Sequence, residues 1–246
     1  MFEVSVNGKL KLEDAIVFLD KDGVTLTYND RRIPSIGERY NSELKFYSED
    51  EFILKKCLEW IKKAKVERDG FNKFFALWVS YNAFYNLYAR KKEESIRNCV
   101  RYRYRNAREL CKIIETQNLL DLEERKTLIQ KCLLRIRELL NETYHVYLGT
   151  DRNRRDVKRD LEERIKEFEK DNNNETIVKE TFETLLKFLY GIRNNLFHGE
   201  KRLSDARQNE LLNYAYEILL PILSLMLIKY CLTSLDANNR QIWSSG

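Results

Sequence analysis

From residue 48 onward, apolar residues recur at the three- and four-residue spacing of an amphipathic helix. The clearest example ends near residue 196, where the intervals between apolar positions alternate between four and three. This stripe consists of Val178, Phe182, Leu185, Leu189, Ile192 and Leu196. Three asparagines at 172–174 precede it, and asparagine is a preferred N-cap residue. The sequence therefore predicts a helix that begins after Asn174 and presents one continuous face to the core.

The same spacing predicts helices across most of the remaining chain. A capping box at 48–51 opens the first of them. Only two prolines, Pro34 and Pro221, interrupt the sequence, so nearly everything between them can be helical. The expected helices cover about 48–66, 71–90, 93–115, 122–141, 151–171 and 204–232.

Residues 1–30 have the alternating pattern of short strands instead. Asn7-Gly8 is a strong hairpin signal, and Asp20 to Gly23 form a second expected turn. Residues 33–41 resemble a linker in composition. We therefore predict a mainly α protein, with a small antiparallel β extension and linker at 1–45 and an α-helical domain at 46–246.

The stretch from Ile218 to Ile228 is apolar on all sides, which indicates either the centre of a helical bundle or a buried subunit interface. It is too short to span a bilayer, and the N-terminus lacks the apolar core of a signal peptide. The five cysteines show no paired spacing, which favours reduced thiols. We expect a cytoplasmic protein without membrane contact. The net charge of +5 is compatible with a polyanionic partner.

A cluster of polar residues ends the helix that begins after Asn174. Arg193, Asn194 and His198 fall within six residues, followed by Gly199, a common residue after a helix end. Asn194 and His198 are four residues apart and share one helix face. A helix C-terminus favours a protonated imidazole and a nearby arginine opposes it, so His198 can titrate near neutral pH.

The run from Arg193 to His198, RNNLFH, resembles the R-x4–6-H signature of the HEPN family. The resemblance implies an up-and-down helical bundle and a metal-independent ribonuclease, as found in bacterial and archaeal toxin, anti-phage and CRISPR systems. It also implies a homodimer with a composite active site. Glu200 replaces the tyrosine seen in the toxins that pair with a nucleotidyltransferase antitoxin, which counts against that subfamily.

Asn82 is a polar residue on the apolar face of the helix expected at 71–90. It can be a buried asparagine bonded to the backbone, or a side chain that points into a catalytic cleft. The pattern Trp78-x-x-x-Asn82-Ala83-x-Tyr85 also resembles the first core helix of several HEPN subfamilies, which favours the second interpretation.

Basic residues offer candidate contacts for RNA. Arg97, Arg101, Arg105 and Arg108 form one stripe on the helix expected at 93–115, with Tyr102 and Tyr104 between them. Arginine can bind phosphates bidentately and tyrosine can stack on unpaired bases, whereas the alternative is a solvated helix face. Lys201 and Arg202 follow the motif in a short basic loop and are further candidates for substrate contact.

The motif has the groups needed to cut RNA without a metal or cofactor. The 2′-OH attacks the adjacent phosphorus, with His198 for proton transfer, Arg193 on the phosphoryl oxygens and Asn194 as an orienting amide. The products carry 2′,3′-cyclic phosphate and 5′-OH ends. A second motif from a two-fold partner would supply a second histidine. Such an enzyme would act as a toxin or anti-phage effector, with an antitoxin or regulator as a possible partner. The alternative is a non-catalytic helical module that binds RNA, a nucleotide or a partner protein.

Overall fold

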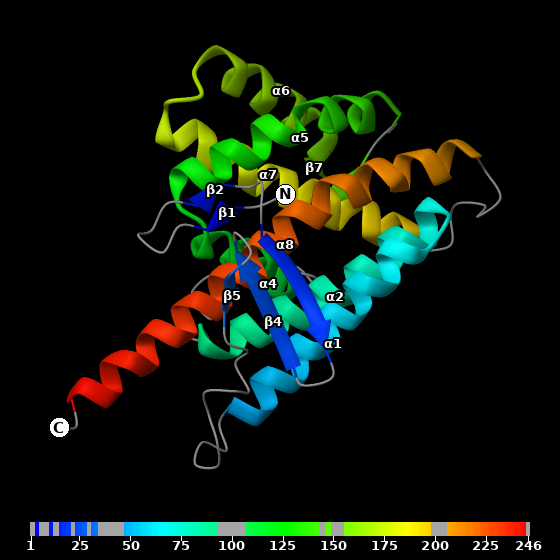
Figure 1. Cartoon of the computed structure of the whole chain (residues 1–246). Coiled ribbons are helices and arrows are strands. Elements are labelled where there is room, and N and C mark those ends of the chain that lie inside the picture. Colours follow the sequence, from blue (N-terminus) through cyan, green and yellow to red (C-terminus); the bar gives the residue numbers. More distant parts are fainter. Residues whose placement is uncertain are drawn as a thin grey trace.

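The computed structural model describes residues 3–4, 10–11, 15–20, 23–28, 31–33, 47–92, 107–142, 146–148, 155–197 and 206–244. Its helices are α1 (Tyr47–Val66), α2 (Gly70–Lys91), α4 (Ala107–Glu115), α5 (Leu122–Glu142), α6 (Val157–Lys170), α7 (Glu175–Phe197) and α8 (Ala206–Ser244). A short 3-10 helix, η1 (Thr116–Leu119), links α4 to α5. The described part of the chain is thus mainly helical, as predicted (Figure 1).

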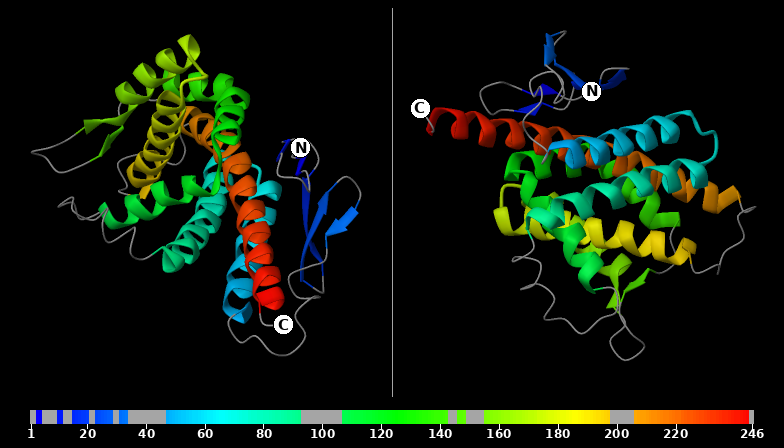
Figure 2. Two further views of the ribbon diagram at one scale, coloured as in Figure 1. Left: turned by 90° about the vertical axis from the view of Figure 1, so that its left-hand side faces the viewer. Right: turned by 90° about the horizontal axis from the view of Figure 1, so that it is seen from below.

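Short strands precede the helices. β1 (Glu3–Val4) pairs with β2 (Leu10–Lys11), and β3 (Ala15–Asp20), β4 (Gly23–Tyr28) and β5 (Arg31–Ile33) form an antiparallel sheet in that order. Asp20 and Gly23 are paired at the end of the β3–β4 hairpin. β3 and β4 lie against α1, and both views in Figure 2 show the strands on the side where α1 and the end of α8 run.

α1 and α2 form a helical hairpin, and α2 continues the packing onto α8. Asp69 caps α2 by accepting a hydrogen bond from the Asn72 amide at 2.8 Å. The first two amides of the helix, those of Gly70 and Phe71, donate instead to Asn209 Oδ1 of α8, at 2.6 and 3.3 Å. A Cβ on Gly70 would lie 2.1 Å from the Asn209 carbonyl oxygen, so this crossing requires glycine.

The second half of the helical body consists of α5, α6 and α7. Asn174 caps α7 by accepting hydrogen bonds from the amides of Thr176 and Ile177, as the asparagine run predicted. α7 packs along α6, and also contacts α5 and α4, whereas α8 packs along α2 and α5. We expected the short link at 199–204 to make α7 and α8 antiparallel neighbours. Within the described residues the main packing partners of α7 and α8 are other helices: α7 packs mainly on α6 and α8 mainly on α2, and both contact α5.

The start of α6 also differs from the prediction. Residues Arg155–Asp156 form β7, which pairs with β6 (Tyr147–Leu148), and the helix begins only at Val157. Asp156 caps α6 by accepting from the Lys158 amide at 3.1 Å, and the Val157 amide donates to the Val146 carbonyl at 2.8 Å. This pairing uses the backbone groups that would otherwise extend the helix toward residue 151.

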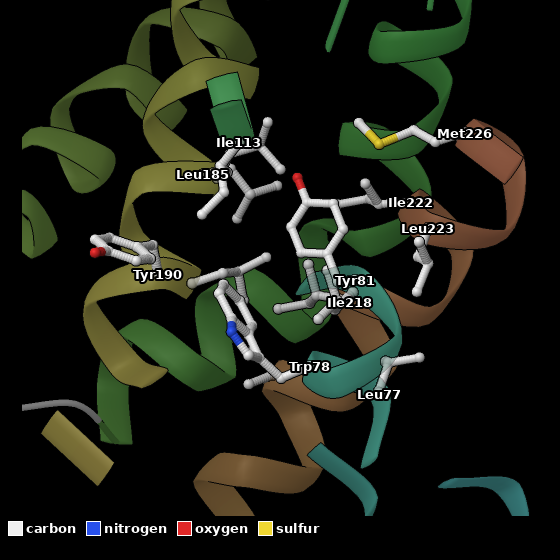
Figure 3. Packing of buried hydrophobic residues seen from close by; sticks show 14 of the residues in the cluster. Leu77, Trp78, Tyr81, Ile113, Leu185, Tyr190, Ile218, Ile222, Leu223 and Met226 are labelled. Atoms are coloured by element: carbon white, nitrogen blue, oxygen red, sulfur yellow. The ribbon is translucent and has the colours of Figure 1, made fainter. Parts of the chain in front are cut away.

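The apolar stretch of α8 lies at the centre of the helical body. Ile218, Leu219, Ile222, Leu223 and Met226 are fully buried within the single chain. Figure 3 shows Ile218 and Ile222 of α8 beside Tyr81 of α2, in one cluster with Leu185 of α7. This stretch is therefore the centre of the helical bundle rather than an exposed subunit interface. By length and composition, Ala206–Leu227 could cross a membrane, yet 56% of its most apolar window is buried inside the protein, as in a core helix.

The cysteines depart in part from the expectation of reduced thiols. Cys57 and Cys132 are free and buried, and burial raises the pKa of each thiol to about 12. Cys111 of α4 is disulfide-bonded instead. Its partner is outside the side chains that the structure describes.

Candidate functional site

The C-terminal turns of α7 hold the first two residues of the motif. Arg193 is half-buried, and its Nη1 donates to Asn194 Oδ1 at 2.9 Å. Asn194 itself is only 9% exposed. Leu189 and Ile192 of the same turns are buried in the core, so they fix the rotation of α7 and hence the direction of the polar pair.

A carboxylate from another helix joins two tyrosines beside this pair. Glu109 of α4 accepts from the Tyr85 hydroxyl of α2 at 2.5 Å and from the Tyr190 hydroxyl of α7 at 3.0 Å. Each tyrosine donates to a different carboxylate oxygen. Asn194 lies one turn after Tyr190 on α7, and hydrogen bonding by its side chain lowers the pKa of that phenol. Figure 3 shows the Tyr190 hydroxyl pointing away from Trp78 and Tyr81, out of the apolar cluster. Three helices thus meet at one polar layer, defined by Tyr85, Glu109, Tyr190, Arg193 and Asn194.

The polar layer keeps both tyrosines protonated. Burial raises the pKa of Tyr85, and the hydrogen bond to Glu109 and the charge of that carboxylate raise it further. Burial raises the pKa of Tyr190 to about 12, while its hydrogen bond with Asn194 acts in the opposite direction. Arg193 lowers the pKa of both phenols through its positive charge. At neutral pH both hydroxyls are therefore donors to Glu109, and neither serves as a base.

Asn82 lies one turn from Tyr85 on α2 and belongs to a second set of contacts. It is half-buried, and its side-chain and backbone oxygens accept from Asn86 Nδ2 at 2.6 and 2.8 Å. Lys112 of α4 donates to Asn86 Oδ1 at 2.6 Å. Asn82 is neither a fully buried asparagine on the backbone nor in hydrogen-bond contact with Arg193 or Asn194. Through Asn86, Asn82 is linked to the α2–α4 contact at Lys112, next to the polar layer.

Several predicted site residues lie outside the described residues. These are His198, Arg97, Arg101, Arg105, Lys201 and Arg202. In the sequence His198 directly follows Phe197, where α7 ends. Of the predicted basic stripe, Arg108 is the described member, and its side chain is exposed at the start of α4. Among the described residues, no three His, Cys, Asp or Glu side chains gather as metal ligands would.

Sequence reasoning missed the contacts that join Tyr85, Glu109 and Tyr190 in the polar layer beside the motif. In the sequence, Glu109 only balances the charge of the arginine stripe. Its two partners are 24 and 81 residues away in the chain, so no local pattern joins them. One signal was present: Tyr190 is four residues before Asn194, on the same helix face, and a tyrosine in an apolar stripe usually needs a partner for its hydroxyl.

Comparisons of the chain with protein-family models, with curated proteins and with solved structures give no match. The resemblance to the HEPN family therefore rests on the residues of the motif and on the Trp78–Tyr85 pattern.

Proposed function

We propose that the chain is a metal-independent endoribonuclease of the HEPN type. In this proposal residues 46–246 form a HEPN-like up-and-down bundle, and residues 1–45 are a small β extension. The observation that carries the proposal is the Arg193–Asn194 pair at the end of α7, hydrogen-bonded at 2.9 Å within a polar layer and followed closely by the motif's histidine. A buried amide requires hydrogen-bond partners, and one partner of the Asn194 amide is the arginine of the motif.

The proposed chemistry follows from the three motif residues. Arg193 holds the non-bridging oxygens of the scissile phosphate, because a guanidinium offers paired donors and stays charged. His198 transfers the proton of the 2′-OH or of the 5′-oxygen leaving group. Asn194 orients the guanidinium from the side opposite the substrate. Cleavage breaks the P–O5′ bond, forms the P–O2′ bond and moves one proton from the 2′-oxygen to the 5′-oxygen, so no co-reactant is needed.

One motif supplies one histidine, whereas the reaction uses both a base and an acid. We therefore propose a homodimer in which two motifs face each other across a two-fold axis. Sedimentation should show a dimer at micromolar concentration, and a stable monomer there would contradict this arrangement.

The basic residues outside the motif are proposed to bind the RNA backbone. These are Arg97, Arg101, Arg105, Lys201 and Arg202, with Asn82 at the adjacent α2–α4 contact. Replacing Arg97, Arg101 and Arg105 with Gln should reduce the salt dependence of binding, by about one unit of slope or slightly less for each phosphate that the protein no longer neutralises. An unchanged slope would assign these arginines to a solvated face.

The deciding experiment is cleavage of labelled RNA with and without EDTA. His198→Ala should lower the rate by roughly 10²–10⁴-fold, and Arg193→Ala should cause a loss of similar size. His145→Ala is the matched control, since it removes the chain's other histidine and should leave cleavage unchanged. Thermal melts of each variant separate lost chemistry from lost folding.

The products provide a second test in the same assay. They should carry 2′,3′-cyclic phosphate and 5′-OH ends and resist an exonuclease that requires a 5′-phosphate. Full cleavage by His198→Ala, or loss of wild-type cleavage in EDTA, would contradict the mechanism and leave the binding-module interpretation.

A further inference from the structure

A directed chain of hydrogen bonds runs from the arginine of the motif to a carboxylate on another helix. Arg193 Nη1 donates to Asn194 Oδ1 at 2.9 Å. Asn194 lies one turn after Tyr190 on the same face of α7, where hydrogen bonding by its side chain lowers the pKa of the phenol. The Tyr190 hydroxyl donates to Glu109 Oε2 at 3.0 Å. Because Asn194 Oδ1 already accepts from Arg193, the amide group left to reach the Tyr190 oxygen is its NH₂. Every step therefore points from the positive end of the chain to the negative end.

We propose that Glu109 is a positioning residue, which sets the orientation of the Asn194 amide through Tyr190 and thereby holds Arg193 for its role. The effect on reaction rate rests on the proposed ribonuclease function. The effect on the Asn194 side chain does not, since it concerns only groups inside the polar layer.

Glu109 can have this effect because the side-chain amide of an asparagine has two possible orientations. The oxygen and nitrogen of Asn194 exchange places when the group turns by half a rotation, at little steric cost. With Glu109 present, the Tyr190 hydroxyl donates its proton to the carboxylate. Toward Asn194, the Tyr190 oxygen can then act only as an acceptor. One amide orientation then satisfies both neighbours: NH₂ toward Tyr190 and oxygen toward Arg193. Charge at both ends of such a chain polarises each bond in the same direction.

Removing the carboxylate frees the Tyr190 proton. It can then be donated to Asn194 Oδ1, which turns the amide and presents NH₂ to the guanidinium of Arg193. Two donors facing each other repel, so the hydrogen bond that holds Nη1 breaks. A guanidinium displaced from its place binds the phosphate less well in the transition state.

Tyr85 provides an internal control. Its hydroxyl donates to the other oxygen of the same carboxylate, Glu109 Oε1, from a different helix. It takes no part in the directed chain or in the proposed chemistry. Tyr85→Phe and Tyr190→Phe each remove one phenolic hydroxyl and one hydrogen bond to Glu109. Only Tyr190→Phe interrupts the chain of hydrogen bonds between Glu109 and Asn194.

The experiment compares four variants of the full chain: Glu109→Met, Glu109→Gln, Tyr190→Phe and Tyr85→Phe. The first readout is kcat for labelled RNA at saturating substrate. The second is the NMR signal pair of the Asn194 side-chain NH₂ in asparagine-labelled protein, assigned by its loss in Asn194→Ala. Methionine matches glutamate in length without offering a strong acceptor, whereas glutamine keeps one amide oxygen.

Glu109→Met and Tyr190→Phe should each lower kcat by on the order of 10- to 10²-fold and shift the Asn194 signals. Glu109→Gln should retain more activity than Glu109→Met. Tyr85→Phe should lower the melting temperature while it leaves kcat and the Asn194 signals close to those of the wild type. This pattern would separate positioning from general stabilisation, which would affect both tyrosine variants alike.

Two results would overturn the inference. One is an Asn194 signal pair that stays in place in both Glu109→Met and Tyr190→Phe. The other is an equal loss of kcat in Tyr85→Phe and Tyr190→Phe that follows their melting temperatures. If the wild type does not cleave RNA at all, the proposed function fails separately, and the Asn194 signals alone decide whether Glu109 positions the motif.

Discussion

The two halves of α7 bury side chains of different kinds. In the first half, Val178, Phe182 and Leu185 are apolar and at most 1% exposed, and they pack into the common core. In the second half, Tyr190 and Asn194 are buried almost as deeply, but they are polar and their contacts are directional. Burial of apolar side chains stabilises a fold without requiring a particular orientation of the groups in contact. A buried hydrogen-bond network adds less net stability, but it requires one arrangement of its donors and acceptors. One helix thus supplies both a stable attachment and a defined polar geometry.

The largest expected effect comes from the apolar half. Phe182→Ala removes a fully buried ring and should lower the free energy of unfolding by about 3–5 kcal/mol, because the helices around the site can relax only in part. Urea unfolding followed by circular dichroism measures this loss. Lys179→Ala, at an exposed position on the same helix, is the control and should change stability by less than about 0.5 kcal/mol.

A smaller loss is expected at Gly191, in the second half of α7. A Cβ on Gly191 would lie 2.1 Å from Val146 Cγ1. Gly191→Ala should therefore cost about 1–3 kcal/mol through overpacking, less the gain of up to about 1 kcal/mol in helix propensity. Gly191→Ala combined with Val146→Ala should recover part of the loss, because the second change removes the methyl group in the way. A Gly191→Ala variant more stable than the wild type would show that Val146 moves freely.

Alkaline pH should act on the polar half. The pKa of Tyr190 is raised to about 12 in the folded protein, whereas an unfolded tyrosine titrates near about 10. Between these values the folded state binds more protons, so the stability that Tyr190 contributes is complete below about pH 10 and is lost as pH rises toward 12. Tyr190→Phe should flatten the pH dependence of unfolding in this window, while Phe182→Ala should leave its slope unchanged. Equal slopes in Tyr190→Phe and the wild type would contradict the assignment.

The smallest effect is expected from a hydroxyl in the apolar half. Thr184 Oγ1 donates to the Glu180 carbonyl within the same helix at 2.7 Å. Such local bonds contribute little, and alanine is the better helix former, so Thr184→Ala should change stability by less than about 0.5 kcal/mol. Tyr190→Phe, which removes a hydroxyl that joins two helices, should cost about 1 kcal/mol or more. A Thr184→Ala loss as large as that of Tyr190→Phe would erase the difference between the halves.

Local signals in the sequence predicted much of this fold. The spacing of Val178, Phe182 and Leu185 predicted α7, and Asn174 predicted its start, because both depend only on neighbouring residues. The structure also bears out the helix expected at 122–141, which it has as Leu122–Glu142. For the site, the same local reasoning found Arg193 and Asn194, which are adjacent in the chain and hydrogen-bonded in the fold.

Local sequence patterns did not predict the tertiary contacts. The packing of α5 against both α7 and α8 depends on how several helix faces match, which no single apolar stripe encodes. The strand at 155–156 exists because residues 147–148 pair with it. Glu109 on an exposed-looking helix gave no sign that two tyrosines from distant segments would donate to it. The sequence therefore predicted features that depend on neighbouring residues, and did not predict contacts between residues far apart in the chain.

The capping of α2 by Asn209 has a consequence for synthesis of the chain. The acceptor of the Gly70 amide is 139 residues later in the chain, on α8. Until α8 has emerged, the start of α2 lacks that partner, and the apolar face that α8 will cover is open to water. The nascent chain therefore needs protection from aggregation until α8 is made, and a chain that stops ahead of α8 would leave the Gly70 and Phe71 amides without this acceptor.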